Sequence, residues 1–332
     1  MIKSVLIANR GEIAIRIART ARRMGIKTYV VRTAKEPEAV YLSAADAVIN
    51  FPETDGNIPE FLDIDRLVGL AREYKIDSLH PGYGYLSENA ELAERCRDNG
   101  IVFIGPSPEV IRLMGDKVAA KGIAAQSGVP MLGASQGAVH TLDEARKIAK
   151  RLGYPVIIKA VSGGGGRGMR IVHHQDELEQ LYKIATAEAQ VAFNDPSVFI
   201  EKYLENPKHI EFQIVADNYG NVVHLGEREC SIQRKHQKLM EEAPSPALDE
   251  RLRKKMAAAA VSLAKQAGYQ SLGTVEFLLD HQKHFYFMEM NTRIQVEHPV
   301  TEEITGIDLV ELQFNIAAGR KLPLRQSQSH LN

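Results

Sequence analysis

A run of five glycines, interrupted by one arginine, constrains this chain more than any other feature of its sequence. Residues 163–168 read GGGGRG and lie between residues 155–159 and 169–172, two mainly apolar runs that each predict a β-strand. The spelling fits the GxGxxG pattern of dinucleotide-binding proteins, but that motif needs a helix after the glycines, because the helix N-terminus holds the pyrophosphate. A Walker A loop is excluded too, since no Gly-Lys-Ser or Gly-Lys-Thr ends the run. The segment therefore predicts a glycine-rich hairpin between two strands.

Two basic residues accompany this hairpin. Lys159 stands at its base and Arg167 lies inside it. A backbone without side chains can close over a polyphosphate and direct N–H groups at it, while a lysine supplies a point charge. The alternative is a flexible surface hairpin. The presence of Lys159 favours the phosphate site.

The first 105 residues or so alternate strand and helix signals. Residues 5–8 predict a buried strand, and the apolar positions 13, 17, 21 and 24 predict a helix that Gly25 ends. The rhythm continues through residues 28–31, 63–75, 76–79, 88–98 and 101–104. It predicts a parallel sheet with helices on both faces. One helical stretch at about 107–127 then leads to a region of strands and hairpins with long helices at 141–152, 174–192 and 247–267.

Two later strands carry carboxylates that we expect to face each other. Residues 274–279 and 285–291 predict strands joined by a polar turn. On such a hairpin Glu276 falls opposite Glu289, and Asn291 points the same way. The two negative charges would repel each other, so we expect a divalent cation to neutralise them. Ligands that are all oxygen favour magnesium or manganese. Alternatively, one glutamate turns to solvent or pairs with a basic side chain.

Three functional groups follow this hairpin at alternate positions. Arg293, Gln295 and Glu297 are separated by Ile294 and Val296, so the three could share one surface. An arginine fork beside a carboxylate suits the binding and deprotonation of a small oxyanion. A solvated pair between an arginine and a glutamate is the simpler alternative.

Charge and cysteine content limit the remaining functions. The 41 basic and 42 acidic residues nearly cancel, which removes the electrostatic case for a dedicated nucleic-acid binder. Cys96 and Cys230 lack metal-ligand spacing and predict no disulfide framework, which favours a reducing compartment. No apolar stretch reaches the ~18–20 residues of a membrane span. The start of the sequence passes into a strand-like run without a signal region. We therefore expect a cytoplasmic protein that binds neither membrane nor nucleic acid.

These stretches together resemble the biotin carboxylases of the ATP-grasp superfamily. The matching runs are residues 7–13, 80–89 (HPGYGYLSEN), 114–117, the glycine run, 201–204, 233–238 and 289–298. The resemblance extends from residue 2 to about residue 320. It implies an α/β fold with a Rossmann-like N-terminal domain at residues 1–113 and an ATP-grasp domain at residues 114–320, whose lid covers about 130–204. Residues 321–332 would form a polar tail without fixed structure.

The resemblance also implies which residues bind ATP and its metal ion. The phosphates would contact Lys117, Lys159, Gly164, Gly165 and Gly166. The adenine would contact Glu201, Lys202, Tyr203, Leu204 and Leu278, and the ribose would lie near His209, Gln233 and His236. Glu276, Glu289 and Asn291 match ligands of Mg²⁺ or Mn²⁺.

The remaining implied roles concern the two other substrates. Bicarbonate would bind Lys238, Arg293, Gln295 and Val296, with Glu297 as the base that deprotonates it. Lys238, Arg293 and Glu297 are thus the expected catalytic groups. Tyr83 would lie near biotin.

The implied activity is the ATP-dependent carboxylation of biotin on a carrier protein, by bicarbonate and through carboxyphosphate. This is the first half-reaction of a biotin-dependent carboxylase, so a carboxyltransferase is a further expected partner, and full-length members form homodimers. The resemblance leaves open whether the parent enzyme is an acetyl-CoA carboxylase of fatty acid biosynthesis, or a propionyl-CoA or pyruvate carboxylase.

Family members continue beyond residue 332 with a C-terminal subdomain, which closes one side of the adenine pocket and supplies an arginine for the biotin enolate. From its absence we expect a catalytically incomplete chain. Two alternatives to the carboxylase activity stay open. One is a truncated fragment that binds MgATP without carboxylating biotin, and the other is an ATP-grasp ligase that joins a carboxylate to an amine.

Overall fold

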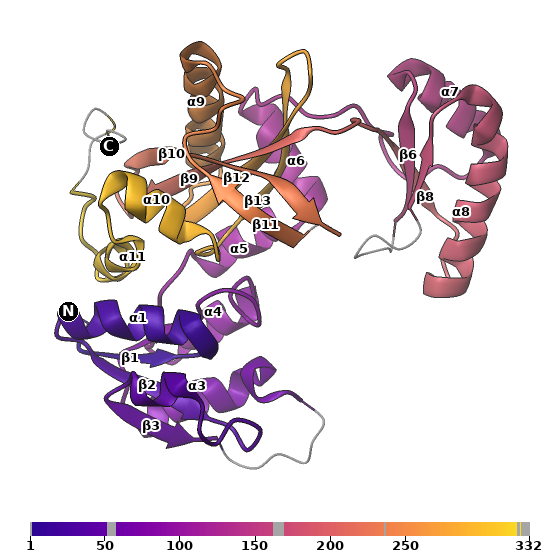
Figure 1. Cartoon of the computed structure of the whole chain (residues 1–332). Helices are drawn as coiled ribbons and strands as arrows, with labels where there is room; N and C mark the ends of the chain where they lie inside the picture. The colour runs from indigo at the N-terminus through magenta and orange to yellow at the C-terminus, as the bar shows by residue number, and fades with distance from the viewer. Residues whose placement is uncertain (1, 52–57, 162–168, 236, 324–325, 327–332) are drawn as a thin grey trace. The chain divides into compact units, whose positions relative to one another are not determined.

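Residues 2–51, 58–161, 169–235, 237–323 and 326 are described by the computed structural model of the chain (Figure 1). The chain divides into two compact units. Unit 1 comprises Met1–Val129, Lys208–Leu279 and Phe287–Asn332, and unit 2 comprises Pro130–Pro207 and Asp280–Tyr286. The lid expected at about 130–204 falls within unit 2, whereas the expected division near residue 113 stays a prediction, since unit 1 includes residues on both sides of it.

The N-terminal part of unit 1 is a parallel sheet with strand order β3-β2-β1-β4-β5. Its strands are β1 (Ser4–Ile7), β2 (Lys27–Arg32), β3 (Ala47–Asn50), β4 (Ser78–His80) and β5 (Val102–Phe103). The helices of this part are α1 (Gly11–Arg23), α2 (Val40–Ser43), α3 (Ile64–Glu73) and α4 (Ala90–Asp98).

The central strand β1 packs against helices on both of its faces. Val5 and Ile7 belong to one buried cluster with Ile13 of α1. Leu6 belongs to the other, with Leu67 of α3 and with residues of α4. Because successive side chains of a strand point to opposite faces, this division confirms the predicted sheet with helices on both sides.

The helical stretch expected at about 107–127 is two helices, α5 (Pro108–Gly115) and α6 (Lys117–Gln126). Asp116 separates them, and its carboxylate accepts hydrogen bonds from the backbone N–H groups of Val118 and Ala119 at 2.8 and 2.9 Å. This side chain caps α6 and so begins a new helix where the apolar pattern alone predicts none.

The second sheet of unit 1 has the order β11-β10-β9-β12-β13. Its strands are β9 (Lys208–Ala216), β10 (Val222–Arg234), β11 (Gln237–Glu242), β12 (Ser271–Leu279) and β13 (Phe285–Asn291), and the pairs β9–β10, β9–β12 and β10–β11 are antiparallel. The accompanying helices are α9 (Glu250–Gln266), α10 (His298–Thr305) and α11 (Leu309–Ala317). The predicted hairpin at residues 274–291 is therefore present as β12 and β13.

Unit 2 contains a three-stranded antiparallel sheet with the order β7-β6-β8. Its strands are β6 (Val156–Ala160), β7 (Met169–Val172) and β8 (Val198–Lys202), and its helices are α7 (Leu142–Leu152) and α8 (Leu178–Phe193). Strands β6 and β7 flank the glycine run, so a strand follows the glycines, as predicted, in place of a helix. The run itself lies outside the described residues.

Two described residues of the expected polar tail make hydrogen bonds to residues of the second sheet and its turn, and the expectation for the tail as a whole stays a prediction. The backbone N–H of Leu322 donates to the carboxylate of Asp217 at 2.9 Å. The side-chain amide of Gln326 accepts from the His224 N–H at 2.9 Å and donates to the His224 carbonyl at 3.1 Å. Asp217 and His224 lie far from the tail in sequence, so a local polarity pattern gives no sign of these contacts.

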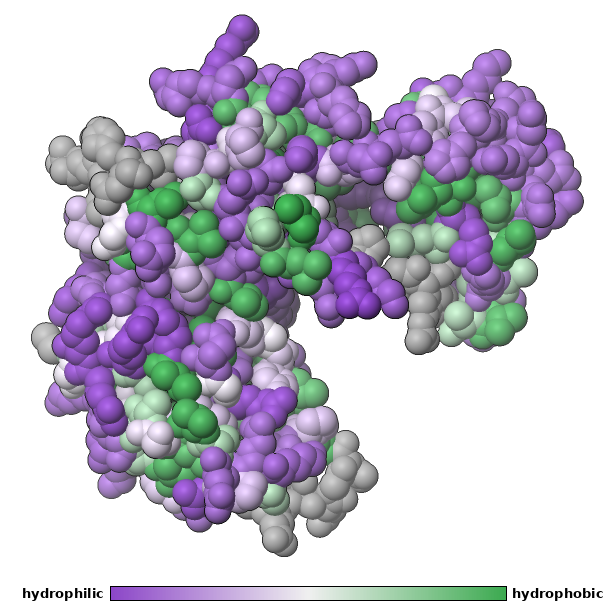
Figure 2. Space-filling model, in the orientation of Figure 1, coloured by the Kyte–Doolittle hydropathy of each residue, from purple (hydrophilic) through white to green (hydrophobic). Residues whose placement is uncertain are grey.

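The face of the molecule seen in Figure 2 is mainly hydrophilic, with several groups of apolar side chains among the hydrophilic ones. Ile232 and Met240, register partners on β10 and β11, are 53% and 58% exposed. None of the helices in the described part of the chain combines the length and apolar character that a membrane span needs.

Candidate functional site

Three charged side chains form a row across the second sheet. Glu211 on the central strand β9 has Arg228 of β10 as its register partner on one side and Glu276 of β12 on the other. All three residues are buried. Two carboxylates on neighbouring strands repel each other, so cationic groups must compensate for them.

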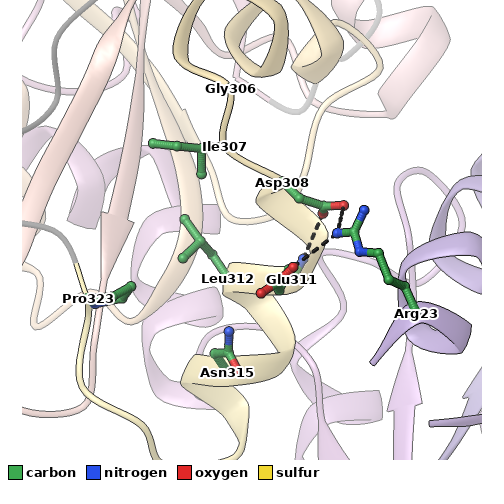
Figure 3. Close-up of a pocket in the computed structure, with 8 residues that line it drawn as sticks. All are labelled: Arg23, Gly306, Ile307, Asp308, Glu311, Leu312, Asn315 and Pro323. Carbon is green, nitrogen blue, oxygen red and sulfur yellow. Dashed lines mark hydrogen bonds and ion pairs between the residues drawn. The ribbon is translucent and has the colours of Figure 1, made fainter. Parts of the chain in front are cut away.

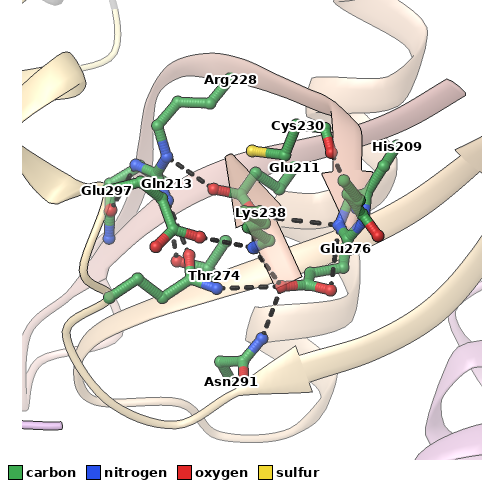
Figure 4. A network of polar contacts seen from close by, with 12 residues as sticks. His209, Glu211, Gln213, Arg228, Cys230, Lys238, Thr274, Glu276, Asn291 and Glu297 are labelled. Carbon is green, nitrogen blue, oxygen red and sulfur yellow. Dashed lines mark hydrogen bonds and ion pairs between the residues drawn. The ribbon is translucent and has the colours of Figure 1, made fainter. Parts of the chain in front are cut away.

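Lys238 of β11 supplies part of that compensation (Figure 4). Its ammonium group donates to Glu211 at 2.6 Å, to Glu276 at 3.0 Å and to Glu297. Burial alone would lower the pKa of Lys238, but the three carboxylates outweigh burial and raise this pKa well above its ordinary value. The lysine therefore stays charged. Of the three glutamates around it, Glu276 and Glu297 were predicted to be site residues and Glu211 was not.

Glu276 is the most heavily contacted carboxylate of this group. Besides Lys238, it accepts hydrogen bonds from the side-chain amides of Asn291 and Gln295, each at 2.9 Å, and its other oxygen lies 3.0 Å from His209 Nε2. Burial opposes its ionisation, but the hydrogen bond from His209 and the charge of Lys238 outweigh burial and hold its pKa far below the ordinary value.

Gln233 contacts the other nitrogen of the His209 ring. Its amide nitrogen lies 3.0 Å from His209 Nδ1. Because an amide nitrogen can only donate, Nδ1 is the acceptor, and Nε2 is the nitrogen that carries the proton. The other residue expected near the ribose, His236, lies outside the described residues.

Glu289 and Asn291 lie on the same face of β13, because their positions differ by two. The contact between Asn291 and Glu276 shows that this face is turned toward Glu276. Glu289 is exposed on the strand, but its carboxylate is partly desolvated, which raises its pKa, and the negative charge of Glu276 raises it further. No hydrogen bond or ion pair of Glu289 is found among the described residues.

These donors fit a divalent cation. A pair of carboxylates on one face, one of them without a basic partner in the described part of the chain, is a site that a hard cation would neutralise. Asn291, the predicted third ligand, directs its amide nitrogen and not its oxygen at Glu276. Its Oδ1 atom accepts a hydrogen bond from Arg293 at 2.8 Å. A second grouping of potential ligand atoms, from His209, Glu211 and Glu276, lies within 4.8 Å, but Lys238 and Arg228 already neutralise it.

Residues 292–297 bring Arg293, Gln295 and Glu297 to one polar centre, although they form a loop and turn in place of a strand. Gln295 contacts Glu276, and Glu297 pairs with Lys238. Burial opposes the ionisation of Glu297, but Lys238 outweighs burial and lowers its pKa. Arg293 forms its ion pair with Glu88, at 3.0 Å. A simple solvated pair between Arg293 and Glu297 therefore does not describe the structure, and Val296 is exposed.

The residues expected at the adenine and phosphates divide between the two units. In unit 2, the ammonium group of Lys159 lies 2.5 Å from Glu201, and that of Lys202 donates to the carbonyls of Gly153 and Tyr154, each at 2.9 Å. Tyr203 and Leu204, both partly buried, follow β8. In unit 1, Lys117 begins α6 and Leu278 lies on β12. The positions of Gly164, Gly165 and Gly166 lie outside the described residues.

Tyr83 lies on the loop after β4, and its hydroxyl donates to Glu12. Burial and this carboxylate raise the pKa of Tyr83 above its ordinary value. The Asn9 amide holds the loop by donating to the carbonyls of Pro81 and Tyr83 at 2.7 and 2.8 Å. Gly82 is required there, because its φ is +66° and an added Cβ would lie 2.9 Å from Asn9 Nδ2.

Sequence reasoning assigned no role to three residues of this centre: Glu88, Glu211 and Arg228. Glu211 could have been predicted from the sequence, because His209, Glu211 and Gln213 alternate with apolar residues along one strand. Glu88 and Arg228 meet their partners only through long-range packing, which leaves no local pattern.

A separate pocket of about 340 Å³ lies beside α11 (Figure 3). It is lined by Arg23, Gly306, Ile307, Asp308, Glu311, Leu312, Asn315 and Pro323. Arg23 pairs with Asp308 at 2.7 Å and with Glu311 at 3.0 Å, so its charge is already balanced. None of these lining residues was predicted to be a site residue.

The sequence of this chain is similar to those of known proteins over almost its whole length. Residues 1–111 match the family model described as the N-terminal domain of biotin carboxylase, and residues 116–325 match that of the ATP binding domain of the carbamoyl-phosphate synthase L chain. The chain is 54% identical, over 98% of its length, to a biotin carboxylase of Nostoc sp., of which it covers 72%. It is 49% identical to biotin carboxylase 1 of Bacillus subtilis, again covering 72%, and 47% identical to human mitochondrial pyruvate carboxylase, covering 28%.

Two solved structures resemble the whole chain. One is a biotin carboxylase complex with β,γ-ATP from Campylobacter jejuni, with a TM-score of 0.91, 47% identity and 74% of that chain covered. The other is the biotin carboxylase domain of a thermophilic 2-oxoglutarate carboxylase bound to bicarbonate, with a TM-score of 0.93, 46% identity and 73% covered.

Proposed function

This chain belongs to the biotin carboxylase family, whose members carboxylate biotin with ATP and bicarbonate, and we propose that the centre around Lys238 is where it activates bicarbonate. One observation carries the proposal. The ammonium group of Lys238 is held by three buried carboxylates, those of Glu211, Glu276 and Glu297. Such an ammonium, with the guanidinium of Arg293 close by, offers charge to a small oxyanion and places a carboxylate within reach of its proton.

Bicarbonate is bound, in this proposal, by Lys238, Arg293, Gln295 and Val296. The carboxylate of Glu297 accepts the bicarbonate proton, and the freed oxygen attacks the γ-phosphorus of ATP. The bond from that phosphorus to the β,γ-bridging oxygen breaks, which yields carboxyphosphate and ADP. The lysine and arginine stabilise the negative charge on the transferred group.

Biotin is carboxylated in the second step. Carboxyphosphate breaks into CO₂ and phosphate, and the phosphate accepts the proton of biotin N1. That nitrogen then attacks CO₂. Tyr83 is proposed to lie beside biotin, on the loop that Asn9 holds in place.

ATP is proposed to bind through the following residues of the ATP-grasp domain. Lys117, Lys159 and the glycine run at Gly164, Gly165 and Gly166 would hold its phosphates. Glu201, Lys202, Tyr203, Leu204 and Leu278 would line the adenine pocket, with His209, Gln233 and His236 at the ribose. One of the two similar structures is a complex with β,γ-ATP and the other is bound to bicarbonate, which supports these two ligand classes.

Glu276 and Glu289 are the residues proposed to hold magnesium. When bound, it would neutralise charge on the ATP phosphates. Asn291 would contribute its amide oxygen, which already accepts one hydrogen bond from Arg293 and has a second lone pair. The all-oxygen set also suits Mn²⁺.

The proposed partners are a biotinylated carrier protein and a carboxyltransferase, with a second copy of the chain as in dimeric relatives. The proposed domains are residues 1–113 and 114–320. The chain spans 72% of the Nostoc enzyme, 61% of a Populus trichocarpa biotin carboxylase and 28% of human pyruvate carboxylase.

The decisive experiment supplies the chain with ATP, magnesium, labelled bicarbonate and free biotin, and measures ADP and labelled carboxybiotin. ADP formation should depend on bicarbonate, and the Lys238→Gln variant should abolish that dependence. Lys254→Gln, on an exposed helix surface, is the matched control and should change nothing. Turnover that ignores bicarbonate, or that requires an added amine acceptor, would contradict the proposal and favour a different ATP-grasp ligase.

A further inference from the structure

The guanidinium of Arg228 is fully buried, and every hydrogen bond that it makes among the described residues goes to a side chain. Nε donates to Glu211 at 2.6 Å. Nη1 donates to Gln213 at 2.9 Å and to Thr301 at 2.7 Å, and Nη2 donates to Gln295 at 2.7 Å and more weakly to Thr274 at 3.4 Å. Arginine has five N–H donors, so each has one partner here.

These contacts determine how Gln295 is turned. Its amide oxygen accepts from Arg228, so its amide nitrogen must face the other way, where it donates to Glu276 at 2.9 Å. The opposite orientation would set an N–H group against the guanidinium and an oxygen against a carboxylate. Arg228 thereby allows only one orientation of this amide.

Glu211 is held by the same means. One of its oxygens accepts from Arg228, and the other accepts from Lys238 at 2.6 Å. Arg228 is in turn fixed from outside the row of charges, by Thr301 on α10 and by Gln213 on β9, whose amide donates to the Gly273 carbonyl at 3.0 Å. The guanidinium therefore connects α10 and the strands β9, β10 and β12 to the side chains of Gln295 and Glu211. Gln295 contacts Glu276, and Glu211 contacts Lys238.

We propose that Arg228 is a positioning residue for bicarbonate binding, acting through the fixed orientations of Gln295 and Glu211. This inference rests on the proposed function, since it assigns Arg228 a part in the same site. Arg228 does not itself contact the reacting groups in this arrangement. Its geometry suits the task, because only a planar fork with five donors can contact both residues and their supports at once.

The test compares Arg228→Lys and Thr301→Val with the unaltered chain. Lysine keeps the charge but has only three donors, whereas valine removes a single support of the guanidinium and keeps the volume. The KM for bicarbonate in ATP cleavage should rise about tenfold in Arg228→Lys and about threefold in Thr301→Val, as expected for lost buried hydrogen bonds. The KM for ATP should stay within about twofold, because neither change touches the proposed nucleotide residues.

The matched control is Arg253→Lys. The guanidinium of Arg253 pairs with the buried carboxylate of Glu227 at 2.7 Å, outside the site. It should lower the melting temperature without raising the KM for bicarbonate. If Arg228→Lys does not fold, Thr301→Val decides the outcome. A melting temperature that falls in the Arg228 and Thr301 variants while the KM for bicarbonate stays unchanged would overturn the inference, since a purely structural role predicts that result.

A double-mutant cycle with Gln295→Met tests the route. If Arg228 acts through Gln295, the double variant should be little worse than the worse single variant, whereas additive losses would overturn that route. Binding of ¹³C-labelled bicarbonate, followed by NMR with MgADP present, separates the two proposals. No binding by the unaltered chain would overturn the proposed function together with this inference. Binding by the unaltered chain with the same affinity in the variants would overturn the inference alone.

Discussion

The carboxylate of Glu88 holds Arg293 by two contacts, one to its side chain and one to the backbone just before it. One oxygen of Glu88 lies 3.0 Å from Arg293 Nε, and the other accepts from the Thr292 N–H at 3.1 Å. The guanidinium also donates to Asn291 at 2.8 Å. The loop that follows β4 thus fixes an arginine of the proposed bicarbonate site that lies 205 positions further along the chain.

Glu88→Gln should therefore weaken bicarbonate binding. The variant loses a charge-assisted hydrogen bond that is partly exposed to solvent, so we expect a loss of about 1 kcal/mol, or a fivefold rise in the KM for bicarbonate. Steady-state ATP cleavage at varied bicarbonate checks this. Glu91→Gln, on the exposed surface of α4, is the control. An equal rise in both variants would argue against a specific contact.

Lys159→Gln should weaken nucleotide binding by about 1–3 kcal/mol, the scale of a contact between a charged group and a phosphate. In the present structure the ammonium of Lys159 lies 2.5 Å from Glu201, so it has to be shared with an incoming phosphate. Titration calorimetry with MgADP measures the effect. Lys183→Gln, which removes an exposed pair within α8, should leave the affinity unchanged. Unchanged affinity in Lys159→Gln would remove this residue from the phosphate site.

Glu276→Gln and Glu289→Gln should each raise the magnesium concentration that nucleotide binding requires. Removing both should add little beyond the larger single effect, because two ligands of one ion act as a unit. Calorimetric titrations of ADP at several magnesium concentrations provide the measurement, with Glu303→Gln as an exposed control. Losses that simply add would place the two glutamates at independent sites.

Asp308→Asn should reduce stability at neutral pH but not at strongly acidic pH. Burial alone would raise the pKa of Asp308, but hydrogen bonds from Thr20, the Glu311 backbone and Arg16 lower it to about 2. A folded-state pKa below the unfolded value of about 3.9 gives stability that is present above pH 4 and is lost as the pH falls toward 2. The shift corresponds to about 2.5 kcal/mol. Urea unfolding of this variant and of Asp98→Asn, at pH 7 and pH 3, measures it; equal losses at both values would contradict the linkage.

Local patterns predicted the parts of the site that a single hairpin or loop contains. Glu276, Glu289 and Asn291 could be assigned to one face because the alternation along β12 and β13 is fixed by the backbone. Glu211 could also have been found by that rule, from its alternation with His209 and Gln213. These side chains lie where their own strands direct them.

The contacts of Arg228 could not be predicted in this way. Strand β9 lies between β10 and β12, so the partners of Arg228 depend on a strand order that is not the order of the sequence. The register then sets Arg228 opposite Glu211. Thr301 joins from α10 and Gln295 from the preceding loop, and no periodicity relates either of them to position 228. Such contacts depend on the packing of the whole unit.

Unit 1 is built from three separate stretches of the sequence, with most of unit 2 between the first and the second. During synthesis the ribosome therefore releases residues 130–207 before it has added any residue of the centre around Lys238 except Glu88. Lys238 meets its last carboxylate only once Glu297 has emerged. Up to that point, the nascent chain holds Glu211 and Arg228 without their full set of neighbours. Long-range contacts of this kind slow folding and leave unfinished surfaces exposed to aggregation until the last partner has been made.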